Sequence, residues 1–212
     1  MLKLPSSPFL YPILDTHFSK DLIMDASEAI RAGTAILQIR AKEYSKAMIA
    51  DVVKRLEPIC QEQNTILIVN DHVDIALVSH AAGVHLGQDD FPASEARSLL
   101  PNRIVGLSTH NRAQFEEALR LPIDYIAVGP VFETSTKTSD HLPLGIDFVS
   151  EVRKLTKKPI ICIGGIREEH FGDLIQAGAD GIALISELYK TGNPGDQIRY
   201  LASRISHPAS QP

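Results

Sequence analysis

Short apolar runs of strand length alternate with helical patterns along the chain, and this alternation constrains the fold more than any other feature. The apolar runs lie at residues 9–14, 34–39, 65–70, 83–86, 103–108, 124–129, 159–164 and 181–186. Helical patterns lie between them at residues 45–63, 72–80, 111–121, 145–155 and 167–178, and Gly178 stands where a helix should stop. Strands that alternate with helices predict a parallel sheet covered by helices.

Eight such strands in a chain of 212 residues predict an α/β protein with a compact (β/α)8 TIM-barrel fold. A doubly wound open sheet is the main alternative. Its usual mark, GxGxxG after the first strand, is absent, because "PILDTHFS" follows instead. No Ser/Gly-rich linker divides the chain. We therefore predict a single barrel domain over residues 1–206, and we expect the tail at residues 207–212 to be disordered.

The composition excludes several classes of protein. The chain is 44% hydrophobic with a net charge of −5, which argues against a nucleic-acid binder with a basic face. No apolar run approaches the roughly 20 residues that cross a bilayer, and prolines interrupt the N-terminal segment that a signal peptide would need intact. Cys60 and Cys162 lie too far apart to suggest a disulfide framework or a zinc site. We expect a soluble, cytoplasmic protein without a nucleic-acid or membrane partner.

Aspartates follow two consecutive predicted strands. Asp71 comes directly after the run that ends at Asn70, and Asp90 ends the segment "GVHLGQDD". The carboxyl ends of barrel strands form one face, so both carboxylates could meet at its mouth. Converging carboxylates repel each other without a cation, and Mg²⁺ favours one or two carboxylates plus phosphate oxygens. Either acid alone could cap the next helix, but the pair on adjacent strands favours a metal site.

Gln38, Arg40 and Lys42 alternate in "QIRAK", at the end of the second predicted strand. A period of two places all three on one side of an extended segment, so the cations approach the mouth if Gln38 faces into the barrel. The planar fork of an arginine and the point charge of a lysine together suit a pyrophosphate. An ordinary solvated basic turn is the alternative interpretation.

Ser108 ends the fifth run within "GLSTH" and offers a hydroxyl at the mouth or a cap for the next helix. No G-x-S-x-G elbow surrounds it, so a nucleophilic serine has little support. His85 and His110 lack the spacing of metal ligands, and we interpret them as packing or capping residues.

Two loops on the later strands have the composition of phosphate sites. The long segment at residues 128–145 carries "ETSTK", whose hydroxyls and lysine could close over phosphate as a lid or form a polar surface loop. Gly164 and Gly165 follow the seventh run. Barrels commonly hold phosphate between the loops after strands seven and eight through backbone N–H groups, whereas the alternative is that these glycines serve only a tight turn.

Taken in order, the motifs resemble those of the thiamine phosphate synthase family. The chain carries "QIRAK", "NDHVDIA", "GVHLGQDD", "GLSTH", "VGPVFETSTK", "IGGI" and "LIS" between residues 38 and 186. The resemblance implies a transferase that joins 4-amino-2-methyl-5-(diphosphooxymethyl)pyrimidine to a thiazole phosphate, or to its carboxylated form. The products are thiamine phosphate and pyrophosphate. The implied reaction is a dissociative, Mg²⁺-assisted displacement without a protein nucleophile.

The resemblance also implies a role for each matching position. Asp71 and Asp90 would hold Mg²⁺, and Lys137, with Arg40 and Ser108, would act in catalysis by stabilising the departing pyrophosphate and the pyrimidine. The pyrimidine diphosphate would be bound by Gln38, Arg40, Lys42, Asn70, Ser108 and Lys137. The thiazole phosphate would be bound by Thr134, Ser135, Thr136, Gly164, Gly165, Ile185 and Ser186.

Three positions depart from the family pattern without removing a proposed ligand. Ala41 replaces an acid, His72 an arginine, and Ser135 a frequent proline. Ala41 has the opposite parity to Arg40 and Lys42, so we expect it to point away from the ligands. The exchange at His72 could alter a salt bridge behind the metal site, and Ser135 could make the lid more flexible.

Two other functions stay open. A thiazole tautomerase paralogue shares the barrel, but that group typically lacks the metal-binding acids and lid threonines that this chain retains. A non-catalytic sensor of thiamine-pathway ligands would keep the barrel as a binding module. Family members often form homo-oligomers, although no apolar stripe in this sequence identifies an interface.

Overall fold

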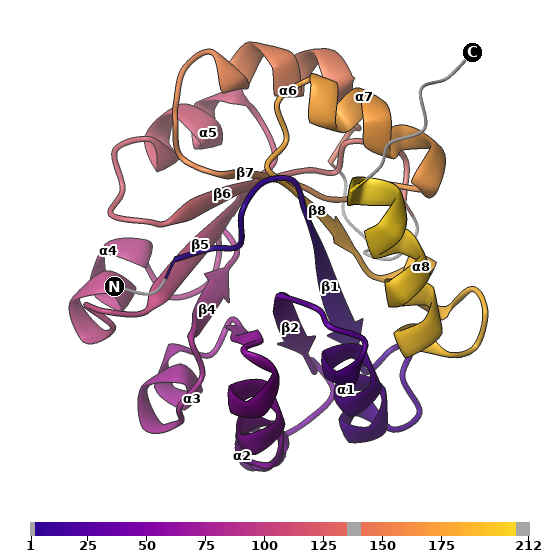
Figure 1. Cartoon of the computed structure of the whole chain (residues 1–212). Coiled ribbons are helices and arrows are strands. Elements are labelled where there is room, and N and C mark those ends of the chain that lie inside the picture. The colour runs from indigo at the N-terminus through magenta and orange to yellow at the C-terminus, as the bar shows by residue number, and fades with distance from the viewer. Residues whose placement is uncertain (1–2, 135–140, 207–212) are drawn as a thin grey trace.

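The protein folds as the predicted closed barrel. The computed structural model describes residues 3–134 and 141–206. Eight parallel strands follow one another around the barrel in chain order, and β1 pairs with β8 to close it. The alternative of an open, doubly wound sheet is wrong, because β1 and β8 leave no free edge between them. The helices form a ring outside the strands (Figure 1).

The strands lie close to the predicted runs. They are β1 (Phe9–Asp15), β2 (Ile36–Arg40), β3 (Ile66–Asn70), β4 (Gly83–Leu86), β5 (Ile104–Thr109), β6 (Tyr125–Val128), β7 (Ile160–Cys162) and β8 (Gly181–Leu184).

The helices include all five of the predicted ones and three that the patterns did not single out. They are α1 (Leu22–Arg31), α2 (Lys46–Gln63), α3 (Val73–Val78), α4 (Ala93–Leu99), α5 (Arg112–Ala118), α6 (Gly145–Arg153), α7 (Phe171–Gln176) and α8 (Pro194–Ser206). The 3₁₀ turns η1 (Glu168–His170) and η2 (Ser186–Tyr189) precede α7 and α8. Gly178 has a φ of +100° just past α7, which confirms the predicted helix stop.

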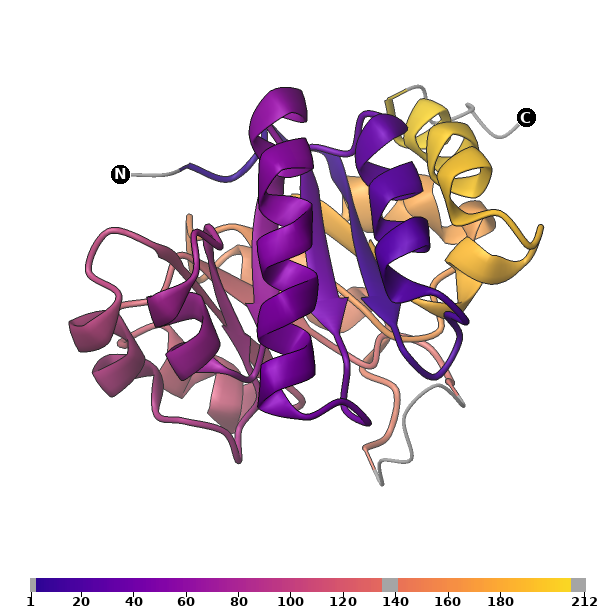
Figure 2. The ribbon, with the colours of Figure 1, turned by 90° about the horizontal axis from the view of Figure 1, so that it is seen from below.

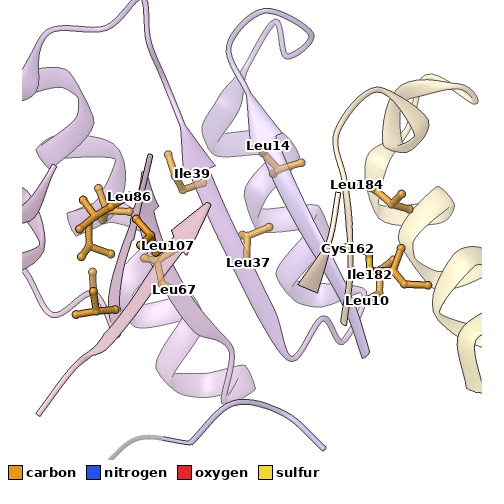
Figure 3. Packing of buried hydrophobic residues seen from close by; sticks show 14 of the residues in the cluster. Leu10, Leu14, Leu37, Ile39, Leu67, Leu86, Leu107, Cys162, Ile182 and Leu184 are labelled. Atoms are coloured by element: carbon orange, nitrogen blue, oxygen red, sulfur yellow. The ribbon is translucent and has the colours of Figure 1, made fainter. Parts of the chain in front are cut away.

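The apolar side chains form two cores on opposite faces of the strands. The outer core fills the space between strands and helices, and Figure 3 shows Leu14, Leu37 and Leu184 within it. The inner cluster fills the barrel with Phe9, Tyr11, Ile13, Ile36, Ile68, Ile104, Tyr125, Ala127, Ile161, Ala183 and Ile185. Leu4, from the segment before β1, packs against this inner cluster. The barrel interior is therefore packed with side chains rather than open.

Strand parity assigns each residue to one of the two cores. Gln38 is 1% exposed and faces the barrel interior, where it contacts Tyr11. Ala41 has the opposite parity and belongs to the outer core, which confirms the prediction that it points away from the mouth. The strand ends of β1 and β2 point to the same side of the molecule in Figure 2, where α1 and α2 pack side by side. Parity and strand direction together decide which side chains reach the mouth.

Several predictions concern residues outside the described ranges. Ser135, Thr136 and Lys137 belong to this group, as does the tail at residues 207–212. Within residues 3–134 and 141–206, no helix combines the length and apolarity that crossing a membrane requires.

Candidate active site

The end of β2 carries an arginine that is held by a buried acid. Asp15 lies opposite Arg40 in the β1–β2 register, and the two side chains form an ion pair. Asp15 is 1% exposed, and it also accepts a hydrogen bond from the backbone N–H of His17 at 2.9 Å. Nε of Arg40 is buried and has no hydrogen-bond partner among the described residues. A buried donor without an acceptor is costly, so the mouth presents a site for an anionic oxygen.

Asp71 and Asp90 approach each other at the ends of β3 and β4, as predicted. Burial, and next a side-chain hydrogen bond with Asp71, raises the pKa of Asp90 above its ordinary value. The backbone N–H of Gly87 donates to Asp90 at 2.7 Å and opposes this rise. Lys42 Nζ lies 2.7 Å from the Asp71 carboxylate. The two acids therefore share one small region with a half-exposed cation beside them.

Neither acid caps the helix that follows it, so that alternative is wrong. The residue before α3 is His72 and the residue before α4 is Pro92, and neither helix receives a side-chain cap. Asp71 itself has a φ of +65°, a left-handed conformation that is uncommon outside glycine. The chain thus turns sharply at the end of β3, and the carboxylate of Asp71 lies beside Lys42 rather than at the start of α3.

Ser108 takes part in a hydrogen bond inside the barrel and does not cap α5. Asn111 is the cap of that helix, since its side chain accepts a hydrogen bond from the N–H of Gln114 at 2.9 Å. Ser108 Oγ lies 2.8 Å from Nε2 of His85, whose Nδ1 lies 2.9 Å from the hydroxyl of Tyr125. His85 is buried and its ring stacks on that of Tyr125, in agreement with the packing interpretation, and both of its ring nitrogens also have hydrogen-bond partners.

A cavity of about 290 Å³ opens over the ends of β5 to β8. Of the predicted site residues, those that line it are Ser108, Thr134, Gly164, Gly165, Ile185 and Ser186. The other described ones lie at the ends of β2 to β4: Gln38, Arg40, Lys42, Asn70, Asp71 and Asp90. Asn70 is the last residue of β3 and is 8% exposed. The mouth thus has a basic and acidic half and a cavity half, with Ser108 between them.

Gly164 and Gly165 are required by both backbone conformation and packing. Their φ angles are +96° and +65°. A Cβ on Gly164 would lie 2.6 Å from Cα of Pro130, and one on Gly165 would lie 2.2 Å from the carbonyl oxygen of Glu133. The turn that follows β7 therefore fits tightly under the loop that follows β6, and its backbone forms part of the cavity wall.

Two histidines at the rim of the cavity were not predicted as site residues. Nδ1 of His110 lies 2.6 Å from the carbonyl oxygen of Gly129, and its ring stacks on His141 with centroids 4.2 Å apart. Both rings line the cavity, as does Arg167. The sequence placed His110 at a strand end, which was a signal, but nothing in it indicated that His141 would lie against that ring. His110 packs against His141, in agreement with the packing interpretation, and it also lines the cavity.

Asp15 was missed although the sequence offered a signal. It ends the first strand, just as Asp71 follows the third, and the argument from strand ends applied to it equally. Its partner Arg40 lies 25 residues further along the chain. Only the register between β1 and β2 shows that the two side chains meet.

Fold and mouth together define a class of protein: a (β/α)8 barrel whose mouth combines basic and acidic side chains with a cavity. The thiamine monophosphate synthase family model matches residues 10–188. The chain belongs to this family. A thiamine-phosphate synthase from Shouchella clausii is 39% identical over 185 residues, which cover 85% of this chain and 88% of that relative.

Further relatives agree in sequence and in structure. A thiamine-phosphate synthase from Chloroflexus aurantiacus is 36% identical over 93% of this chain and 92% of its own length. The solved structure of thiamine phosphate pyrophosphorylase from Pyrococcus furiosus superposes with a TM-score of 0.83 at 28% identity. That comparison covers 93% of this chain and 96% of the other, so the likeness extends over nearly the whole barrel.

Proposed function

We propose that this protein is a thiamine phosphate synthase, a transferase that joins the pyrimidine diphosphate to the thiazole phosphate and releases pyrophosphate. The observation that carries the proposal is the two-part mouth, in which a basic and acidic half adjoins a separate cavity at Ser108. Two phosphorylated substrates need two such places side by side. Holding them in contact supplies much of the rate when no protein nucleophile takes part.

The basic half suits the diphosphate of the pyrimidine substrate. The unpartnered Nε of Arg40 would donate to a phosphate oxygen, and the ion pair with Asp15 fixes the direction of the guanidinium. Lys42 is half-exposed and can turn from Asp71 toward the same oxygens. Gln38 and Asn70 lie deeper, where their amides would contact the pyrimidine. Negative charge builds up on the pyrophosphate as it departs, so these cations would stabilise the transition state more than the bound substrate.

We further propose that Asp71 and Asp90 hold Mg²⁺. Burial raises the pKa of Asp90 and the contact with Asp71 raises it further, and a cation between the two carboxylates would relieve their repulsion. Within the described residues, no third His, Cys, Asp or Glu joins them, and Mg²⁺ commonly takes one or two carboxylates together with phosphate and water oxygens. Bound there, the ion would supply positive charge to the leaving pyrophosphate.

The cavity half suits the thiazole phosphate. Backbone groups of Gly164, Gly165 and Ser186 line its wall, as phosphate sites after the seventh and eighth strands of barrels require. Thr134 lines it from the loop that follows β6. Roles for Ser135, Thr136 and Lys137 in this region rest on the family resemblance, because these residues lie outside the described ranges.

The test is an assay with both phosphorylated substrates, in Mg²⁺ and in EDTA, in which thiamine phosphate is read as its fluorescent oxidation product. We expect product with Mg²⁺ and almost none with EDTA. Isomerisation of the thiazole carboxylate phosphate without metal, in the absence of any coupling product, would support the tautomerase instead. Binding of both substrates by calorimetry without pyrophosphate release would support the sensor.

Two further expectations belong to this proposal. Cys60 and Cys162 are free, buried thiols, which is usual for a protein of the reducing cytoplasm, where we expect this enzyme to act. Homo-oligomerisation, which the family resemblance suggests, stays a prediction that sedimentation of the purified protein would test.

A further inference from the structure

A continuous chain of hydrogen bonds crosses the interior of the barrel just below the mouth. Gln38 Nε2 donates to the hydroxyl of Tyr11 at 3.0 Å, and that hydroxyl lies 3.0 Å from the hydroxyl of Tyr125. Tyr125 contacts Nδ1 of His85 at 2.9 Å, and Nε2 of His85 contacts Ser108 at 2.8 Å. The five side chains come from β2, β1, β6, β4 and β5, and none is more than 8% exposed.

The barrel is shaped to accommodate this chain. A Cβ added at Gly106 would lie 2.0 Å from Cζ of Tyr125, so only glycine at that position leaves room for the tyrosine ring. The rings of His85 and Tyr125 stack with an interplanar angle of 12°, and Tyr11 meets Tyr125 edge-on at 83°. The other members of the inner cluster are isoleucines, two alanines and Phe9, all apolar. Polar groups buried this deeply are tolerated because each one has a hydrogen-bond partner.

The number of protons available along this chain of hydrogen bonds fixes which group donates and which accepts at each step. The hydroxyl of Tyr11 accepts from Gln38, so its single proton goes to Tyr125, its other contact among the described residues. Tyr125 then has one proton left for Nδ1 of His85. A neutral imidazole that accepts at Nδ1 carries its proton on Nε2, which donates to Ser108. The hydroxyl proton of Ser108 is thereby directed away from the barrel interior.

Burial keeps the two phenols in the required form. It raises the pKa of Tyr11 and of Tyr125 well above the ordinary value for tyrosine. Each phenol therefore retains one proton throughout the range in which proteins work. The direction of the chain is the same for every molecule, because no phenolate forms that could accept from both sides.

We propose that Tyr11, Tyr125 and His85 are positioning residues. They make Ser108 a hydrogen-bond donor to the substrate, and they leave the side-chain amide oxygen of Gln38 as an acceptor for it. The chain begins and ends at residues on the two sides of the mouth. An aminopyrimidine carries both a donor, its amino group, and acceptors, its ring nitrogens. The two ends of the chain would match it in one orientation only. The part that concerns substrate rests on the proposed function, whereas the direction of the chain does not.

The direction can be measured without any substrate. In protein labelled with ¹⁵N-histidine, long-range ¹H–¹⁵N correlation spectra distinguish the Nε2–H from the Nδ1–H tautomer, and His85→Gln identifies the signals of His85. We expect the Nε2–H tautomer. An Nδ1–H tautomer or a doubly protonated ring would overturn the proposal, because either one reverses or breaks the chain. This result stands whether or not the protein forms thiamine phosphate.

The consequence for substrate is tested by Tyr125→Phe, which removes one hydroxyl from the middle of the chain. We expect mixed His85 tautomers and a KM for the pyrimidine diphosphate that rises about fivefold to tenfold, the equivalent of one neutral hydrogen bond. The KM for the thiazole phosphate should stay within about twofold. Tyr200→Phe is the matched control, since it removes a phenol that is 51% exposed on α8 and bonded to Glu168.

A folded Tyr125→Phe variant with an unchanged tautomer and an unchanged pyrimidine KM would overturn the proposal. An equal rise in both KM values would also overturn it, because a general loss of packing affects both halves of the mouth. If the wild-type protein made no thiamine phosphate at all, the proposed function would fail while the tautomer measurement would still decide the direction of the chain.

Discussion

Two pairs of aspartates at opposite ends of the barrel differ in their interaction partners. At the end where the strands begin, Asp124 pairs with Arg97 and accepts from the backbone N–H of Val105 at 2.7 Å. Asp180 repeats this arrangement, with Arg153 at 2.7 Å and the N–H of Ile160 at 2.9 Å. At the mouth, Asp71 and Asp90 face each other instead, and the nearby cation is the half-exposed Lys42.

The difference shows which charges serve the fold and which are available to a ligand. Each acid at the lower end has a planar guanidinium and a fixed N–H, so its interactions are complete within the protein. The pair at the mouth has the half-exposed Lys42 beside it, and a cation bound between the two carboxylates would relieve the repulsion that remains. Barrels of this kind place stability at one end and chemistry at the other. Asp71 and Asp90 follow that division, whereas Asp15 at the mouth is paired with Arg40 and a backbone N–H in the manner of the lower acids.

The largest effect should come from removing one acid of the mouth pair. We expect Asp90→Asn to lower the rate of thiamine phosphate formation about a hundredfold or more, the usual loss when one electrostatic stabiliser is deleted. The fold should survive, because the asparagine keeps a side-chain oxygen that can accept from the N–H of Gly87, while the repulsion from Asp71 is removed. Steady-state assays and chemical denaturation measure both quantities.

Asp89→Asn is the control for this prediction, since Asp89 is the adjacent residue and is exposed. Its rate should stay within about twofold of the wild type. If Asp90→Asn retained a near-normal rate, the assignment of a metal to this pair would be wrong.

The opposite pattern is expected at the other end of the barrel. Asp124→Ala should lower the free energy of unfolding by about 2 kcal/mol, because it leaves Nη2 of Arg97 and the N–H of Val105 without the carboxylate that accepts from them. The activity per folded molecule should be unchanged. Urea unfolding followed by circular dichroism gives the first quantity, and active-site titration of the native fraction gives the second.

Asp196→Ala is the matched control, because Asp196 pairs with Arg199 on the surface of α8. Its loss should cost no more than about 0.5 kcal/mol. A large loss of activity in Asp124→Ala without a loss of stability would contradict the division between the two ends.

The smallest expected effect concerns pH. The pKa of Asp90 is raised in the folded protein, so the native state holds this proton when the unfolded state has already lost it. In metal-free protein, the contribution of Asp90 to stability must therefore fall as pH rises above the unfolded value of about 3.9, until the folded pKa is passed.

Asp90→Asn lacks this titration. Its stability relative to the wild type should increase with pH over that window and then stay constant. Unfolding curves of the two proteins, measured from about pH 3.5 to about pH 7, test whether this stability difference increases with pH. The interval spans roughly the range of carboxyl pKa values found in folded proteins. Parallel curves would mean that the pKa of Asp90 is not raised in the folded protein.

The fold and much of the mouth could be predicted because they depend on local pattern. Each predicted apolar run overlaps an observed strand, and consecutive strands are neighbours in a barrel, so Asp71 and Asp90 had to lie close together. Gln38 faces the interior because parity along a strand has a period of two. Helix α4 escaped prediction because its buried residues are two alanines, Ala93 and Ala96, which give a weak apolar period.

The sequence by itself therefore determined the alternation of strands and helices, the face on which each strand residue lies, and much of the set of residues at the mouth, although not Asp15 or His141. The tertiary structure decided which of them bond to one another. The hydroxyls of Tyr11 and Tyr125 form a hydrogen bond although the two residues are 114 positions apart in the sequence. Arg40 lies beside Asp15 because of the register between β1 and β2. Such contacts depend on barrel closure and on the space that Gly106 leaves, and no local pattern in the chain records either of these.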